Sequence, residues 1–501
     1  MQQTPSNCIQ IDSEAEAVEF NRFFQRCIGS CHAYLTLRED FRKQARTVQE
    51  EIAFRYIRCH GIFHDWVGVC HPLDGELHYN FQNVDKIYDF FLSVGLRPYV
   101  ELSFMPQALA SDLGKTTFRY EANISPPADM KQWNCMIHAF VTHLIGRYGL
   151  DEVRQWYFEV WNEPDLKDLF WSGDQQDYLE LYRHTATTIK AIDQQLPVGG
   201  PSTSKNLWLE ETIAFCVDNN LPLDFISTHH YCADAALETG SDVFDIAYRG
   251  QKAMVEDVRR TVDIVKKSAF PDIEIHYSEW NVSPCHEDRF GKDSEFNATF
   301  VLQTLTDLDG LLDVYSYWCL SDIFEETGPG LNPFSGKYGL MNLHGIRKPV
   351  FHAYQFLAQL YDEEVPTALD NCRVSRSGQD WRILHWNFVD PLETDFNGGD
   401  YLIPQTELTQ ELVLTGLEGH YQVTAYRVDR EAGNAYRAWQ RQGQPQYPNP
   451  EQLAELERAS HAVKFMDNTV EVLEEYGGEL RLESQLAANA LIFYDISKNS
   501  A

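Results

Sequence analysis

Short runs rich in β-branched and aromatic residues alternate with longer amphipathic stretches from about residue 30 to residue 355. Eight such runs, most of them followed by a helical pattern, predict a (β/α)8 barrel, an α/β fold. The predicted strands are His32–Thr36, Phe54–Arg58, Arg97–Leu102, Tyr157–Trp161, Leu196–Gly199, Asp224–Thr228, Glu274–Ser278 and Asp313–Tyr317. The predicted helices include Trp133–Tyr148, Gln176–Asp193, Trp208–Asn219, Ala253–Lys267 and Ala298–Asp309.

A doubly wound open sheet is the alternative α/β architecture for this alternation. Such a sheet normally carries a glycine-rich dinucleotide-binding turn after an early strand. The sequence contains neither G-x-G-x-x-G nor a P-loop pattern. The closed barrel is therefore the favoured prediction.

The pattern changes after about residue 360, where short strands are separated by Pro, Gly and Asn turns. This change predicts a β-sandwich-like accessory domain. One segment, Asn449–Ala462, is predicted to be helical, because Asn449 can cap it and Pro450 stands at its first position. The turn-rich patch Asp390–Asp400 is predicted to be an exposed loop. The predicted strands are Trp381–Phe388, Gln410–Thr415, Tyr421–Val428, Glu479–Glu483 and Leu491–Tyr494.

We expect three parts along the chain. Residues 1–30 form an N-terminal segment that packs with the accessory domain, residues 31–358 the catalytic barrel, and residues 359–501 the accessory domain. The tryptophans of that last region do not form an obvious platform for stacking a sugar, so we expect its role to be structural. These tryptophans are Trp381, Trp386 and Trp439.

Composition narrows the possible partners. The 501 residues are 44% apolar, which is ordinary for a globular protein, but the net charge is −34. Such a surface repels phosphate backbones and anionic membranes, so nucleic acid and membrane partners are excluded, and polyanionic substrates are disfavoured. The chain shows no basic-then-apolar leader pattern and no run of about 18 apolar residues. Eleven scattered cysteines, an odd count, favour reduced thiols and a cytoplasmic location.

Metal-binding patterns are weak in this sequence. Cys27 and Cys31 form a C-x3-C pair with no second pair nearby, and no H-E-x-x-H occurs. His138 and His143 are five residues apart, which places them on different faces of a helix. We therefore expect no metal site, with the cysteines buried as small hydrophobic residues.

Two glutamates stand at the ends of predicted strands. Glu163 precedes Pro164, which cannot continue a central strand, and alternation along that strand would give Glu159, Trp161 and Glu163 one face. Glu279 ends a second alternating strand, 116 residues later, a distance that fits three βα units. By count these are strands 4 and 7 of the barrel, and active sites of barrels lie at the carboxyl ends of their strands.

Two carboxylates that face each other across a barrel mouth suit the cleavage of a glycosidic bond. One carboxyl group protonates the leaving oxygen, and the other presents negative charge to an oxocarbenium-like centre. A separation of about 5–5.5 Å makes the second carboxylate a nucleophile and retains configuration, whereas about 6.5–9.5 Å admits a water and inverts it. The sequence does not fix this separation.

An ordered set of motifs extends the similarity beyond these two glutamates. WNEP at the end of strand 4 and S-E-W at the end of strand 7 resemble the retaining clan of barrel glycosidases. Over most of its length the chain resembles family 39 glycoside hydrolases and, among them, the β-xylosidases. The motifs are FRYIRCHG at 54–61, RPYVELSFMP at 97–106, EVWNEPDLKDLFW at 159–171, VGGPS at 198–202, DFISTHHY at 224–231, YSYWCLSDIFEE at 315–326, KYGL at 337–340 and YPNPEQL at 447–453.

The resemblance implies a retaining, exo-acting β-D-xylosidase that releases xylose from the non-reducing ends of xylooligosaccharides, without a cofactor. The sequence leaves open whether the protein forms a homo-oligomer. The resemblance implies that Glu163 is the general acid/base and Glu279 the nucleophile. It also implies that Asn162 binds the sugar 2-hydroxyl, a hydrogen bond that strengthens in the transition state. The other implied substrate-binding residues are His60, His229, Tyr231, Trp318 as an apolar platform, and Glu325 or Glu326 as a hydroxyl acceptor.

Two positions depart from the family's pattern. Trp280 stands where the family commonly has tyrosine, so the hydrogen bonding of Glu279 is expected to differ there. His230 stands where a smaller residue is common. Both changes are expected to affect sugar preference without touching the two carboxylates. Because of the strongly negative charge, keeping Glu279 ionised requires specific hydrogen-bond donors.

Two other functions stay open. A family 39 hydrolase with another glycone, of the α-L-arabinosidase or α-L-iduronidase type, is the first. An iduronidase needs basic residues for a uronic carboxylate, and the net charge of −34 disfavours it. An arabinose glycone differs from xylose only in the stereochemistry of ring hydroxyls. The second, a non-catalytic sugar-binding protein, predicts the loss of one or both carboxylates, and both are present.

Overall fold

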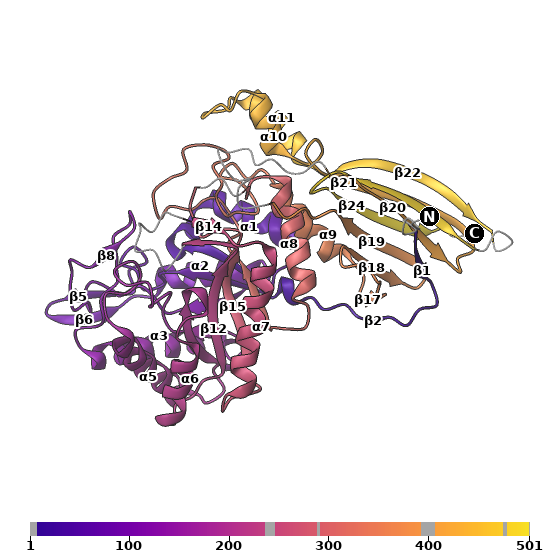
Figure 1. The fold of residues 1–501 in the computed structure, drawn as a ribbon. Coiled ribbons are helices and arrows are strands. Elements are labelled where there is room, and N and C mark those ends of the chain that lie inside the picture. The colour runs from indigo at the N-terminus through magenta and orange to yellow at the C-terminus, as the bar shows by residue number, and fades with distance from the viewer. Residues whose placement is uncertain (1–7, 236–245, 288–290, 392–405, 474–477, 500–501) are drawn as a thin grey trace.

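The structure, a computed structural model, describes residues 8–235, 246–287, 291–391, 406–473 and 478–499. Eight parallel strands close into a barrel in the order β10-β11-β12-β15-β16-β3-β4-β7. This confirms the predicted (β/α)8 barrel, and its helices pack around the strands (Figure 1). The barrel strands are β3 (Cys27–His32), β4 (Tyr56–His60), β7 (Arg97–Glu101), β10 (Tyr157–Glu159), β11 (Val198–Thr203), β12 (Phe225–Tyr231), β15 (Glu274–Asn281) and β16 (Val314–Tyr317).

The helices between the barrel strands match the amphipathic stretches of the sequence to within three residues where they were predicted. Capping explains several of their ends: Asp174 both caps α5 and forms a reciprocal capping box with Asp177. The helices of this region are α1 (Glu39–Glu51), α2 (Gln82–Ser93), α3 (Met130–Tyr148), α4 (Leu150–Val153), α5 (Gln175–Ile192), α6 (Leu209–Asp218), α7 (Gln251–Lys267), α8 (Glu295–Asp307) and α9 (Pro349–Gln359).

The first barrel strand begins earlier than expected. The prediction of a strand over His32–Thr36 is wrong, because β3 ends at His32 and Ala33–Leu37 is a 3-10 helix. Local side-chain bonds favour this turn, since His32 Nδ1 accepts from Tyr34 N and Thr36 Oγ1 donates to Ala33 O. All six residues of β3 are buried, so the strand lacks the alternation that marks a half-exposed one.

Small two-stranded ribbons lie in the loops of the barrel. Strands before and after the barrel form two further sheets, of which the larger is antiparallel and the smaller is mixed, because β1 runs parallel to β20. The ribbons are β5 (Cys70–Leu73) with β6 (Glu76–Tyr79), β8 (Thr116–Thr117) with β9 (Ala122–Asn123), and β13 (Ala233–Ala235) with β14 (Ile246–Tyr248). The strands of the two sheets are β1 (Cys8–Asp12), β2 (Val18–Glu19), β17 (Glu363–Glu364), β18 (Cys372–Ser377), β19 (Asp380–Trp386), β20 (Leu408–Thr415), β21 (Gly419–Val428), β22 (Val463–Val472), β23 (Leu480–Leu486) and β24 (Leu491–Lys498).

The accessory region is a sandwich of these two sheets. A seven-stranded sheet, β2-β17-β18-β19-β24-β21-β22, shares one apolar core with the three-stranded sheet β1-β20-β23. The N-terminal strands belong to these sheets, since β1 pairs with β20 and β2 with β17, and both chain ends lie at this region in Figure 1. The barrel, however, already begins at Cys27, within the predicted N-terminal segment. The division into separate domains stays a prediction.

The three tryptophans of this region are all buried. Trp381 lies in the sandwich core, Trp386 donates to Gln303 of α8, and Trp439 packs against Phe334. None is exposed for stacking a sugar, which agrees with the structural role that we expect. Trp439 belongs to α10 (Ala435–Arg441), next to α11 (Pro450–Ala459).

Helix α11 lies within the predicted segment Asn449–Ala462. As expected, Asn449 caps it: its side chain accepts from the backbone N–H of Gln452. Of the predicted loop Asp390–Asp400, only residues 390 and 391 lie among the described residues. The 11 cysteines form no disulfide in the structure. Within the described residues, no helix has the length and apolar character needed to cross a membrane.

Candidate active site

A buried arginine lies at the centre of the barrel, near the carboxyl ends of the strands. Arg58 of β4 donates from Nε to Glu159 at 2.6 Å, from Nη1 to Glu279 at 2.8 Å and from Nη2 to Asn162 at 2.8 Å. Its Nη2 also lies 2.9 Å from Glu101. The guanidinium is fully buried, so its charge is compensated by three carboxylates at close range. One cation therefore orients most of the polar groups of the site.

Glu279 lies within β15 and receives two donors. Arg58 binds its Oε1, and the hydroxyl of Tyr231 donates to its Oε2 at 2.8 Å. His60 Nε2 is 3.5 Å from Oε1. These contacts stabilise the ionised carboxylate in a buried position. The sequence predicts such donors, because the chain carries a strongly negative net charge.

Glu163 reaches the site from a turn rather than from a strand. Strand β10 ends at Glu159, and the backbone is left-handed at Trp161 (φ 72°) and Glu163 (φ 42°). The expected common face of Glu159, Trp161 and Glu163 is therefore wrong, because regular alternation stops before Trp161. The backbone N–H of Glu163 donates to Ser202 O at 2.8 Å, which holds this strained turn against β11.

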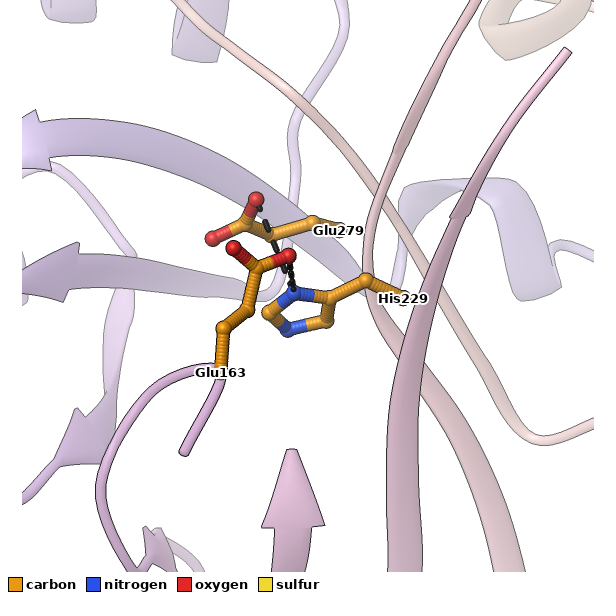
Figure 2. A group of neighbouring side chains, drawn as sticks. All are labelled: Glu163, His229 and Glu279. Atoms are coloured by element: carbon orange, nitrogen blue, oxygen red, sulfur yellow. Dashed lines mark hydrogen bonds and ion pairs between the residues drawn. The ribbon is translucent and has the colours of Figure 1, made fainter. Parts of the chain in front are cut away.

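The two glutamates approach each other closely around His229. One carboxylate oxygen from each and one nitrogen of His229 all lie within 4.8 Å of one another, and the side chains point toward one another (Figure 2). His229 Nδ1 lies 2.9 Å from Glu163 Oε1. Burial, together with Arg58, lowers the pKa of His229 to about 4, so the ring is neutral at pH 7. These three groups have the spacing of metal ligands. Because Glu279 is already bound to the guanidinium of Arg58, a catalytic pair of carboxyl groups is favoured over a metal site.

His60 and Glu326 form the wall of the site next to Glu279, and both side chains keep their protons at neutral pH. Burial opposes the charged form of His60, but Glu101 at 2.6 Å, Glu279 and Glu326 outweigh it and raise its pKa to about 9. Burial and the charge of Glu279 raise the pKa of Glu326 to about 8, although His60 lowers it. His286 Nε2 lies 2.5 Å from Glu326 Oε2. At neutral pH this wall is a cation beside a neutral carboxyl group.

Asn162 has a free donor that is suited to a sugar hydroxyl. Its Oδ1 accepts from Arg58, which orients the amide. Its Nδ2 is buried and has no partner among the described residues. An unpaired buried donor is costly unless a ligand satisfies it. This geometry suits the role that the family resemblance implies for Asn162.

The last barrel strand supplies an aromatic wall. Trp318 follows β16, is almost fully buried, and lies 4.7 Å from the ring of His60, centroid to centroid. Its ring passes over Gly29, where a Cβ would come within 2.3 Å of it. Of the two candidates for hydroxyl acceptor, only Glu326 faces the site. Glu325 points outward and forms an ion pair with Arg38.

The two departures from the family's pattern lie outside the site. Trp280 stacks on Tyr315 at 4.2 Å, and its Nε1 donates to Tyr315 O. His230 Nε2 is 2.7 Å from Tyr315 Oη. Both side chains neighbour Glu279 or His229 in sequence, so alternation turns them to the opposite face of their strands. Trp280 takes no part in the hydrogen bonding of Glu279, whose donors are Arg58 and Tyr231. The effect of the two changes on sugar preference stays a prediction.

The sequence reasoning missed four polar residues of the site: Arg58, Glu101, Glu159 and His286. A usable signal existed for three of them. Arg58, Glu101 and Glu159 are charged residues within predicted barrel strands. A barrel interior accepts such groups only if they pair with one another. His286 carries no comparable signal, since it lies in the loop after β15.

A fully buried ion triad supports the loops that carry Trp318 and Glu326. Lys348 Nζ lies 2.6 Å from both Asp293 and Asp322. Lys348→Met leaves two buried carboxylates without their cation, so we expect the free energy of unfolding to fall by about 3–5 kcal/mol. Urea unfolding followed by tryptophan fluorescence measures this. The control Lys115→Met removes an exposed ion pair and should cost under about 1 kcal/mol. Equal, small effects of both variants would contradict the prediction.

The proton on Glu326 predicts how stability depends on pH. The unfolded carboxyl group loses this proton near its ordinary pKa of 4.5, whereas the folded protein keeps it to about 8. The stability linked to Glu326 is therefore complete below about pH 4.5 and is lost as the pH rises through about 8. Glu326→Gln should flatten the decline in unfolding free energy between about pH 5 and 9. Urea titrations across that range test this, with Glu325→Gln as the control. An unchanged slope in Glu326→Gln would contradict the prediction.

Comparison with known proteins agrees with this geometry. The sequence model of glycosyl hydrolases family 39 matches residues 7–472. A β-xylosidase of Caldicellulosiruptor saccharolyticus is 40% identical over 455 residues, covering 89% of this chain and 90% of the relative. The crystal structure of a monomeric β-xylosidase from Caulobacter crescentus CB15 superposes with a TM-score of 0.91 at 35% identity, covering 98% of this chain and all of that one. A family 39 enzyme from Xanthomonas axonopodis pv. citri gives a TM-score of 0.92 at 34% identity, with 99% and 98% coverage.

The match over nearly the whole chain, together with relatives above 30% identity, shows the family. Paired glutamates at the mouth of a barrel are an arrangement that suits glycoside hydrolysis. The chain is a glycosidase that belongs to glycosyl hydrolases family 39.

Proposed function

We propose that this protein is a retaining, exo-acting β-D-xylosidase that releases xylose from the non-reducing ends of short xylooligosaccharides. The observation that carries the proposal is the close approach of Glu163 and Glu279, within 4.8 Å between oxygens. That spacing suits direct attack by a carboxylate and leaves no room for the water that inverting enzymes place between their carboxyl groups.

The contacts of each glutamate suit a different role in a double displacement. The Glu279 carboxylate, oriented by Arg58 and Tyr231, attacks C1 of the sugar, while protonated Glu163 donates a proton to the leaving oxygen. A glycosyl-enzyme ester forms on Glu279. Glu163, now a carboxylate, removes a proton from water, which cleaves that ester. Neutral His229 contacts Glu163 without adding a charge to it.

Contacts between loops support exo action. Arg119 N, in the loop after β7, donates to Glu326 O, in the loop after β16, at 2.8 Å. Arg38, just after the first barrel strand and its 3-10 turn, forms an ion pair with Glu325. Three loops are thus joined behind Glu326. A site closed at this end holds one terminal sugar and releases the rest of the chain from the open side.

A neutral pentose is the glycone that the charges favour. Arg58 is fully engaged by three carboxylates and by Asn162, so it is not available for a uronic acid. The relatives from C. saccharolyticus and C. crescentus are both β-xylosidases. These observations disfavour an α-L-iduronidase. The choice between xylose and arabinose as the glycone requires a direct comparison of the two substrates.

Two measurements test the proposal. A panel of aryl glycosides should give the highest kcat/KM with β-D-xylopyranoside, and xylotriose should yield xylose and xylobiose as first products. Proton NMR of the early reaction should show β-xylose before mutarotation, because two displacements retain configuration. α-Xylose as the first product would exclude a retaining mechanism. A higher kcat/KM for an arabinoside would exclude the xylosidase assignment.

A further inference from the structure

Two buried polar atoms beside the site have no hydrogen-bond partner among the described residues. They are Nε2 of His32 and the hydroxyl oxygen of Tyr120. His32 is 1% exposed and Tyr120 is 4% exposed, so bulk water does not satisfy them. Their rings are 4.5 Å apart, centroid to centroid. Two unpaired groups side by side indicate a place for a polar ligand.

Both groups lie next to residues of the candidate site. His32 is the β3 partner of His60 in the register of β3 with β4. Tyr120 follows Arg119, whose N–H donates to Glu326 O at 2.8 Å. Gly61, just after His60, keeps the space in front of His32 open, since a Cβ there would come within 3.2 Å of Nε2. His32 and Tyr120 therefore neighbour the wall that His60 and Glu326 form.

The protonation of His32 makes it a hydrogen-bond donor. Its Nδ1 accepts from Tyr34 N at 3.1 Å, so the proton of the neutral ring is on Nε2. Burial and the neighbouring His64 and His60 hold its pKa well below the ordinary value, so the ring is neutral. The site therefore offers an N–H donor and a hydroxyl, a combination that suits the hydroxyl group of a sugar.

The position of the sugar follows from the proposed function, on which this inference rests. C1 must lie between Glu163 and Glu279, and the 2-hydroxyl at Asn162. C4 lies opposite C1 in a pyranose ring, and in the pose that this inference requires it reaches the side of the site where His32 and Tyr120 lie. We propose that His32 and Tyr120 hydrogen-bond the 4-hydroxyl of the terminal sugar, and so select xylose over its C4 epimer in this ring form, arabinopyranose.

Tyr120→Phe removes one oxygen and keeps the ring. We expect kcat/KM for an aryl β-D-xylopyranoside to fall about tenfold, the loss of one hydrogen bond. The same variant should leave kcat/KM for the 4-deoxy-xyloside within about twofold of wild type. Its preference for xyloside over α-L-arabinopyranoside should fall as well. His32→Gln, which alters the second donor, should show the same pattern.

Tyr354→Phe is the matched control, because the Tyr354 hydroxyl is also buried and unpartnered but packs near Phe24 and Phe54, outside the barrel. Tyr354→Phe should leave kcat/KM unchanged for both the xyloside and the 4-deoxy-xyloside. Equal losses of Tyr120→Phe on the xyloside and the 4-deoxy analogue, or no loss on either, would overturn the inference. Failure of the proposed function is distinguishable, since the wild-type enzyme would then not turn over the xyloside.

Discussion

Glu279→Ala is expected to lower kcat for an aryl β-xyloside by about 10⁵-fold or more, the size of effect seen when a catalytic nucleophile is removed. The physical reason is that no described side chain takes its place. Arg58 and Tyr231 converge on the Glu279 carboxylate itself, so the variant leaves two donors and no nucleophile. Steady-state kinetics with a p-nitrophenyl glycoside measures the loss.

Added azide should restore turnover in Glu279→Ala. The missing side chain leaves space for a small anion on the face from which Glu279 attacks, beside Arg58. Attack from that face gives α-xylosyl azide, of inverted configuration, which NMR identifies. Glu325→Ala is the control, since Glu325 lies next to Glu326 in sequence but pairs outward with Arg38. Near-wild-type activity of Glu279→Ala without azide would show that the nucleophile is another group.

The barrel and its two glutamates were predictable because they follow from periodic patterns. Glu279 ends an alternating strand, and Pro164 marks where the strand before Glu163 must stop. The start of the barrel was not predictable in this way. Strand β3 is buried along its whole length, so it shows no alternation, and the turn after His32 depends on side-chain bonds within the turn.

The polar network around Glu279 was harder to predict than the glutamate itself. Which charged strand residues meet inside a barrel depends on the register between strands, and register is a tertiary property. Arg58 joins Glu101, Glu159 and Glu279, which lie on three other strands. The left-handed turn at Glu163 likewise depends on its bond to Ser202, about 40 residues away in the chain.

The network around Glu279 compensates, within the site, for the negative charge of a chain whose net charge is −34. The sequence pointed to Trp280, the residue beside the nucleophile, as the position where the hydrogen bonding of Glu279 would differ. In the structure Trp280 faces the opposite side of the sheet, against Tyr315. The compensation comes instead from Arg58, whose side chain is fully buried. The chemistry of the site should therefore depend on one distant strand residue.

Arg58→Met tests this dependence and should affect both activity and stability. It leaves Glu101, Glu159 and Glu279 buried without their cation, so we expect the free energy of unfolding to fall by about 3–5 kcal/mol. Arg58 also donates to Glu279 Oε1 and Asn162 Oδ1, so the variant loses the group that orients both side chains. At neutral pH, kcat/KM should fall about 10³-fold, equivalent to about 4 kcal/mol. Urea unfolding and steady-state kinetics at neutral pH measure the two effects.

Two further variants separate charge from geometry. Arg58→Lys keeps the positive charge but loses the fork that binds several partners at once, so it should retain most of the stability and lose much of the activity. Arg97→Met removes a partly exposed arginine of strand β7 that pairs with Glu152, and should cost under about 1 kcal/mol. If Arg58→Met kept the wild-type kcat/KM, the contact of Arg58 with Glu279 would not be needed for catalysis. If Arg58→Lys matched wild-type activity, charge alone would suffice, and the orientation of Asn162 by the guanidinium would be unimportant for catalysis.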